Sequence, residues 1–238
     1  MMSWNDDRRW LRVSHAPDVW TWSSSSATFF DLRMLAIKLK DGGIVVVSPV
    51  PDVDEISMAT LDSFGPVTAL LAPNYYHNLG LKPFLRRYPS AKLYAHERAI
   101  PRLEKVTSLS FTDVIELQDV LPKGLHMAFP EGLKQGEVWI HTETNGENPS
   151  ILAVCDCFFN MRPGKKFLLD KFFRMVNTYP GLKVSRMFGW IAIDDKHRYV
   201  AWLRHFFKEY NPKLLVPSHG DIYESSQLTK ELLELACK

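Results

Sequence analysis

Residues 70–80 read Leu70-Leu71-Ala72-Pro73-Asn74-Tyr75-Tyr76-His77-Asn78-Leu79-Gly80. The apolar run 67–71 that leads into this stretch predicts a buried strand. Pro73 and Asn74 end that strand, and His77 lies in the loop that follows. In α/β sheets, loops beyond the carboxyl ends of the strands carry the functional side chains. The stretch therefore predicts a strand followed by a loop in which His77 is the candidate functional residue.

Two further polar residues occupy the same kind of position. Asp156 follows the apolar run 151–154, and His219 follows the run 214–216. Any one of these residues alone is explained as well by capping or hydrogen bonding at a strand end. Two imidazoles and one carboxylate together form a competent ligand set for zinc or a similar divalent ion, with one position left for water. The joint pattern predicts a metal site made by His77, Asp156 and His219.

Three segments of the chain resemble the metallo-β-lactamase superfamily. Residues 70–80, with 88–95 after them, resemble its H-x-H-x-D-H strand, loop and helix and the strand that follows. Residues 150–156 resemble the strand that ends in the metal-bridging aspartate, and 216–221 resemble the closing His-Gly motif. The order of elements follows the superfamily from about Trp10 to Ile222. The resemblance implies a four-layer αββα sandwich of the α/β class, and the length of 238 residues is compatible with a single domain over residues 1–238.

The resemblance implies that every ligand belonging only to the first metal site is replaced in this sequence. Ala72 and Asn74 stand where the superfamily has two histidines of the first site, and Tyr76 stands where it has an aspartate of the second site. Only His77 remains from that motif. The superfamily's Pro-Gly-His-Thr turn corresponds here to residues 129–133, which read Phe-Pro-Glu-Gly-Leu. The resemblance therefore implies that the first site is lost.

The surviving residues His77, Asp156 and His219 map onto three of the four protein ligands of the second site. One zinc, iron or manganese ion held by them would activate water for hydrolysis of an ester, lactone, amide or phosphoester. Asn74 would then orient substrate or stabilise an oxyanion, and Tyr76 would donate a hydrogen bond, unless both only fill the space of the lost ligands. The alternative function is a metal-free protein that binds a ligand or partner without catalysis.

Hydrophobic periodicity predicts the other elements. Strands are expected at 19–22, 32–39, 44–47, 92–94, 125–129 and 137–141, and helices at 53–64, 81–88, 167–176, 199–210 and 228–235. An Asp-Gly pair at 41–42 between two β-branched runs predicts a hairpin. Asp52, with Glu55 three residues later, predicts a capping box at the start of the first helix.

Composition limits the partners and the compartment. The chain has 29 Lys and Arg against 27 Asp and Glu, which is too balanced to predict a nucleic acid or an anionic membrane as partner. Three cysteines are too few and odd in number for a disulfide scaffold. The N-terminal residues lack the pattern of a signal peptide, and no run is apolar over the ~18 residues of a membrane span. We expect a cytoplasmic protein with a small-molecule ligand, and the sequence does not predict its oligomeric state.

Other residues of metal-binding type are expected to be structural. Cys155 and Cys157 flank Asp156 and, in a continuing strand, would point away from its carboxylate. We expect them to be buried small hydrophobes rather than thiolate ligands or a redox pair. Four histidines have no partner at ligand spacing and are expected in structural or surface roles: His126, His141, His197 and His205.

A basic and aromatic segment follows the candidate aspartate. It contains residues 162–166, Lys171, Arg174, Lys183 and Arg186, together with Phe167, Phe172 and Phe173. Such a mixture can bind single-stranded nucleic acid. The simpler hypothesis is that the phenylalanines face the core beside a solvated basic face, and we do not expect nucleic acid as a partner.

Overall fold

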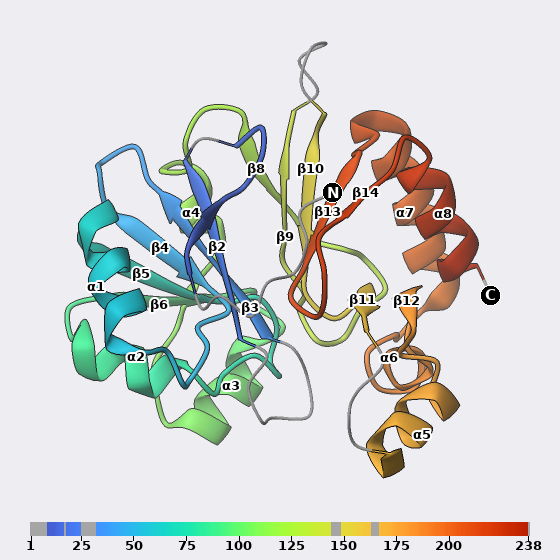
Figure 1. Cartoon of the computed structure of the whole chain (residues 1–238), viewed down its shortest axis with the longest axis horizontal. Helices are drawn as coiled ribbons and strands as arrows, with labels where there is room; N and C mark the ends of the chain where they lie inside the picture. The colour runs from blue at the N-terminus through green and yellow to red at the C-terminus, as the bar shows by residue number, and fades with distance from the viewer. Residues whose placement is uncertain (1–8, 17, 25–31, 144–148, 163–166, 238) are drawn as a thin grey trace.

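Two β-sheets lie face to face at the centre of the structure, and helices cover their outer faces (Figure 1). The computed structural model describes residues 9–16, 18–24, 32–143, 149–162 and 167–237, with only the backbone at 167–170. The arrangement has the four layers expected of an αββα sandwich.

The first sheet holds seven strands in sequence order. They are β1 (Leu11–Arg12), β2 (Val19–Ser24), β3 (Leu32–Lys38), β4 (Ile44–Val47), β5 (Val67–Ala72), β6 (Lys92–Ala95) and β7 (Thr112–Asp113). Strands β1 to β4 pair antiparallel, and β4 to β7 pair parallel. The predicted hairpin is confirmed: β3 and β4 pair across the turn, where Gly42 has φ +88° and the Asp41 carboxylate accepts the Gly43 N–H.

The second sheet has the order β14-β13-β10-β9-β8. Its strands are β8 (Leu125–Ala128), β9 (Trp139–Thr142), β10 (Ile151–Val154), β13 (Leu214–Pro217) and β14 (Tyr223–Glu224). Strands β10 and β13 pair parallel, and the other pairs are antiparallel. A separate two-stranded sheet joins β11 (Phe159–Met161) to β12 (Gly181–Lys183).

Eight helices complete the part of the chain that the structure describes. They are α1 (Glu55–Phe64), α2 (Leu81–Arg87), α3 (Ile100–Thr107), α4 (Ile115–Gln118), α5 (Phe167–Met175), α6 (Arg186–Ile191), α7 (Lys196–Tyr210) and α8 (Leu228–Ala236). Figure 1 shows α1, α2 and α3 beside the first sheet and α7 and α8 beside the second. None of the described helices combines the length and the apolar character that crossing a bilayer needs.

Strand alternation separates three apolar layers. Leu71 of β5 packs between the two sheets with Ile151 of β10, whereas its neighbour Leu70 packs under α1, α2 and α3. On the second sheet, Leu152 turns the other way and packs under α7 and α8. Because successive strand side chains point to opposite faces, continuous apolar runs are the pattern of strands buried on both sides. Each fully buried leucine contributes about 1.5–3 kcal/mol to folding.

Three sequence predictions need correction. The first helix is capped by Asp54, whose carboxylate accepts the Ser57 N–H, and not by Asp52. The predicted strand 137–141 is shifted to β9, Trp139–Thr142, because the Glu137 side chain turns inward to accept hydrogen bonds. Phe172 is 42% exposed and does not face the core, whereas Phe173 is buried.

Candidate metal centre

The structure brings the three predicted ligands together from the two sheets. His77 lies in the loop after β5, Asp156 follows β10 and His219 follows β13. Strands β10 and β13 are parallel neighbours, so their carboxyl ends lie at the same edge. The loop after β5 meets them across the sandwich, and the donor atoms of the three residues lie within 4.8 Å of one another.

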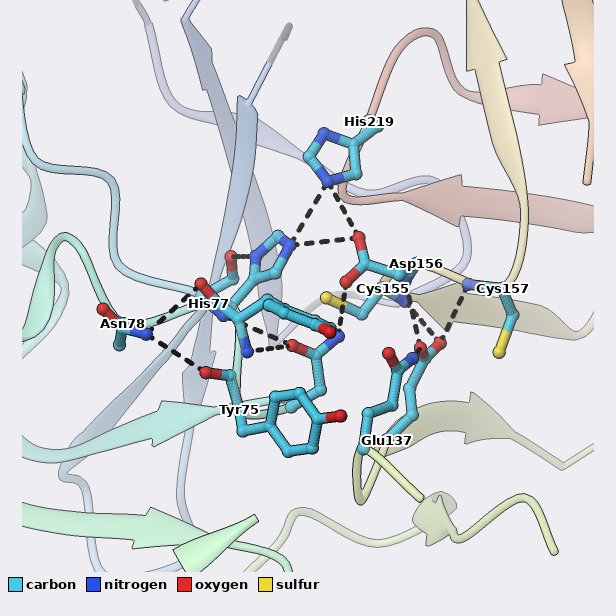
Figure 2. Close-up of polar contacts among 12 residues, drawn as sticks. Tyr75, His77, Asn78, Glu137, Cys155, Asp156, Cys157 and His219 are labelled. Atoms are coloured by element: carbon cyan, nitrogen blue, oxygen red, sulfur yellow. Dashed lines mark hydrogen bonds and ion pairs between the residues drawn. The ribbon is translucent and has the colours of Figure 1, made fainter. Parts of the chain in front are cut away.

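The three side chains converge on one point (Figure 2). The Oδ1 atom of Asp156 lies 3.2 Å from Nε2 of His77 and 3.0 Å from Nε2 of His219, and the two Nε2 atoms are 3.2 Å apart. Ligand atoms about 2.0–2.1 Å from a tetrahedral zinc ion lie roughly 3.3 Å from one another. The donor types and the edge lengths of this triangle therefore fit one divalent ion with a remaining open position.

The His77 imidazole is oriented by two polar neighbours. The Ser48 hydroxyl lies 2.7 Å from Nδ1, on the side of the ring opposite Asp156. The Asn74 side-chain oxygen accepts the backbone N–H groups of Tyr76 and His77, which closes the turn that carries the imidazole. When the Ser48 hydroxyl accepts a hydrogen bond from Nδ1–H, the proton of the neutral ring is on Nδ1 and Nε2 is free to bind a metal. The position of Ser48 is therefore compatible with the form of His77 that a metal site needs.

Asp156 is held as a carboxylate. Its Oδ2 atom accepts a hydrogen bond of 2.7 Å from the Asn74 amide, while Oδ1 faces the two imidazoles. Burial raises the pKa of Asp156, but the charge and hydrogen bonds of His77 and His219 lower it by more, so this pKa lies below its ordinary value. Burial lowers the pKa of His77, and Asp156 more than reverses this effect. The pair therefore favours its ionised forms.

A buried glutamate supports the segment that carries Asp156. The Glu137 carboxylate accepts the backbone N–H groups of residues 155, 156 and 157, the Trp139 indole N–H and the Gln135 amide. Figure 2 shows the Glu137 carboxylate on one side of the segment 155–157 and the two imidazoles on the other side. Burial and the nearby Asp156 raise the pKa of Glu137 above its ordinary value. Five donors directed at one carboxylate fix the backbone from which Asp156 projects.

The loop that carries His219 is held by the opposite sheet. Arg33 of β3 donates from Nε to the Pro217 carbonyl and from Nη2 to the Gly220 carbonyl. Gly220 has φ +97°, and a Cβ there would lie 2.0 Å from the Asn160 carbonyl oxygen. Only glycine fits this backbone conformation and this close approach. The His219 ring, only 5% exposed, therefore sits in a loop with little freedom to move.

A cavity of about 340 Å³ opens above the three side chains. His77, Asp156 and His219 contribute to its wall together with apolar residues from β3, the loop after β4, β11 and α6. Tyr76 also lines the cavity, where the Arg102 guanidinium lies 5.1 Å from its ring. The cluster is therefore open to a small molecule.

Other residues singled out in the sequence lie away from the cavity. Asn74 is fully buried, and its side chain is engaged with Asp156 and the loop backbone rather than facing the cavity. Residues 129–133, which the resemblance aligned with a metal-binding turn, are not among the cavity-lining residues, but Gln135 is. Cys155 and Cys157 are buried, as expected, and burial raises the pKa of both thiols.

Sequence reasoning missed three supporting residues. Ser48 follows a strand as directly as the candidate ligands do, so its position was a usable signal. Glu137 and Arg33 carried no such signal, because each is a single charged residue whose partners include backbone groups from other segments. The four histidines expected in structural roles are outside the metal-binding cluster found among the described residues.

A scan of protein-family models gives no match to this chain, and no curated protein sequence matches it. Solved structures do match over nearly the whole length. A metallo-beta-lactamase from Pontibacter korlensis has a TM-score of 0.62 and 16% identity, covering 97% of this chain and 99% of that one.

Two further solved structures are similar to this chain over nearly its whole length. The DIM-1 metallo-beta-lactamase has a TM-score of 0.63 and 12% identity over 96% of each chain. A metallo-beta-lactamase from Hirschia baltica has a TM-score of 0.58 and 14% identity over 96% of this chain and 98% of that one. These likenesses, with the two sheets, their helical layers and the position of the cluster, show that the chain has the metallo-β-lactamase fold.

Proposed function

We propose that this protein is a metal-dependent hydrolase of the metallo-β-lactamase superfamily with a single ion held by His77, Asp156 and His219. The observation that carries the proposal is the triangle of donor atoms, with edges of 3.0–3.2 Å, at the floor of a cavity. Zinc suits two imidazoles and one carboxylate, and iron or manganese are the other candidates. The substrate would be a small molecule with an ester, lactone, amide or phosphoester bond.

Each residue near the ion would have a distinct role. A divalent ion in this position supplies Lewis acidity and lowers the pKa of water toward neutrality. Ser48 would keep the Nε2 atom of His77 available as a ligand by accepting a hydrogen bond from Nδ1, and Asn74 holds Asp156 by its second oxygen. Tyr76 would donate a hydrogen bond to substrate, a role supported by its position in the cavity lining. Asn74 is better suited to positioning than to stabilising an oxyanion, because its side chain is buried and engaged.

A second candidate is a metal-free binding protein. It is favoured by Oδ1 of Asp156, which lies within hydrogen-bond distance of both imidazoles, and by Ala72, which is buried where the superfamily has a ligand. In that case the cluster is a hydrogen-bonded structural network and the cavity alone binds the ligand.

Hydrolysis assays separate the two candidates. The protein is loaded with zinc, manganese or iron(II) and offered p-nitrophenyl esters, a lactone, an anilide and a bis-p-nitrophenyl phosphodiester. Hydrolysis that is lost with chelator and in His77→Ala and His219→Ala supports the proposal. The matched control is His205→Ala, at a histidine whose side chain is 81% exposed, and it should retain full activity. Absence of hydrolysis of every compound favours the binding protein, and hydrolysis that survives chelator contradicts the proposal that the reaction depends on a metal.

A further inference from the structure

The surface that lines the cavity above the cluster is mainly apolar. Its walls carry hydrocarbon and aromatic side chains from four separate segments: Leu32, Val50, Phe159, Met187, Phe188 and Ile191. Helix α6 supplies three of them, with Phe188 buried and Ile191 40% exposed at the surface. A molecule that enters therefore exchanges water for apolar contacts along most of its length.

Among the cavity-lining residues that the structure describes, the ionisable acid and the two histidines lie together at the floor. Apart from His77, Asp156 and His219, its described lining residues include no lysine, arginine, aspartate or glutamate. A carboxylate or phosphate on the substrate would thus have no fixed cationic partner along the walls. Moving an ionised group from water into such surroundings is costly unless it is paired.

Apart from Tyr76, the polar side chains that the structure describes in the walls are engaged with the protein. Thr178 and Ser185 hydroxyls lie 3.1 Å apart. The Gln135 amide donates to Glu137, and the Asn78 amide donates to the Tyr75 carbonyl 3.1 Å away. These bonds turn the polar groups toward the protein, so what the walls offer to a ligand is mainly apolar surface.

We infer that the substrate is a small uncharged ester or lactone with a hydrocarbon chain, bound with its carbonyl at the cluster and its chain along α6. This inference rests on the proposed function and narrows its substrate class, since it removes substrates that carry an ionised group on the part that lies along the walls. A cavity of about 340 Å³ is near the lower end of the usual size for small-molecule sites, so the substrate is small.

The inference is tested on metal-free protein, so its outcome does not depend on catalysis. The uncharged fluorescent probe N-phenyl-1-naphthylamine is bound at pH 8 in the presence of chelator, then displaced with methyl octanoate or with octanoate. These competitors differ chiefly in charge. We expect methyl octanoate to displace the probe at a concentration at least about tenfold lower than the concentration of octanoate that is needed.

Two variants locate the binding. Ile191→Glu puts a carboxylate at the cavity wall and should weaken binding of the probe about tenfold. Ile115→Glu makes the same change at a residue that is 55% exposed and outside the cavity lining. This variant should bind the probe as tightly as the unmodified protein does. Displacement by octanoate at an equal or lower concentration, no binding of the probe, or equal binding by both variants would overturn the inference. A protein that passes these tests but takes up no metal would refute only the hydrolase proposal.

Discussion

Glu137→Gln tests whether the buried carboxylate fixes the segment that carries Asp156. In the structure, Oε1 accepts the Cys155, Cys157 and Trp139 N–H groups at 3.0–3.3 Å. A glutamine oxygen in that place keeps these three bonds. Its NH2 group would replace Oε2, which accepts the Asp156 N–H at 3.1 Å and the Gln135 amide.

The expected loss of stability depends on which N–H groups still have an acceptor after the substitution. The Gln135 amide can turn to offer its oxygen, but the Asp156 N–H faces a second donor and loses its acceptor. One buried unsatisfied donor costs about 1–3 kcal/mol, and removal of the buried charge recovers part of its desolvation cost. We therefore expect the free energy of unfolding to fall by about 1–2 kcal/mol, and the Tm to fall by roughly 3–6 °C.

The assay is urea unfolding followed by the fluorescence of the seven tryptophans, with a thermal scan alongside. Glu97→Gln, at an exposed glutamate, is the matched control and should change the free energy of unfolding by less than about 0.5 kcal/mol. If Glu137→Gln is as stable as the unmodified protein, or if both variants lose the same stability, the positioning role of Glu137 is refuted.

Three other changes test separate parts of the structure. Ser48→Ala removes the group 2.7 Å from Nδ1 of His77, and titration calorimetry should show metal affinity lowered by about 10–100-fold, whereas unchanged affinity would exclude the orienting role. Burial lowers the pKa of His141 from 6.5 to about 4, so its uncharged form is the stable one in the fold. Stability should therefore be complete above about pH 6.5 and fall by about 3 kcal/mol as the pH approaches 4, and urea unfolding at several pH values should show a smaller fall for His141→Phe. Gly220→Ala forces a Cβ to 2.0 Å from a carbonyl oxygen at φ +97°, and thermal unfolding should show a loss of at least about 2 kcal/mol; an unaltered Tm would mean that the loop adapts freely.

Most of the fold could be predicted from short patterns in the sequence. The apolar runs that became β4, β5 and β10 are continuous because both faces of these strands are buried, and the Asp-Gly turn fixes one hairpin. Helix α3 was missed, because Pro101 beside its first residue looks like a break although proline is tolerated there. The single domain and the cytoplasmic location stay predictions.

The candidate site was predictable only for residues that follow a strand directly. His77, Asp156 and His219 share that position, and parallel pairing brings such positions together. Arg33 contacts Pro217, 184 residues away, and Glu137 contacts Asp156, 19 residues away. Both contacts are made to backbone atoms, which do not depend on the residue type. Such contacts become visible only in the folded chain.

The metal content of protein purified without chelator tests the central claim most directly. Elemental analysis should find about one zinc, iron or manganese ion per chain in the unmodified protein and in His205→Ala, and almost none in His77→Ala or His219→Ala, each verified as folded by circular dichroism. A folded unmodified protein that takes up none of these ions, even after incubation with each, would contradict the claim, as would an ion retained in both variants.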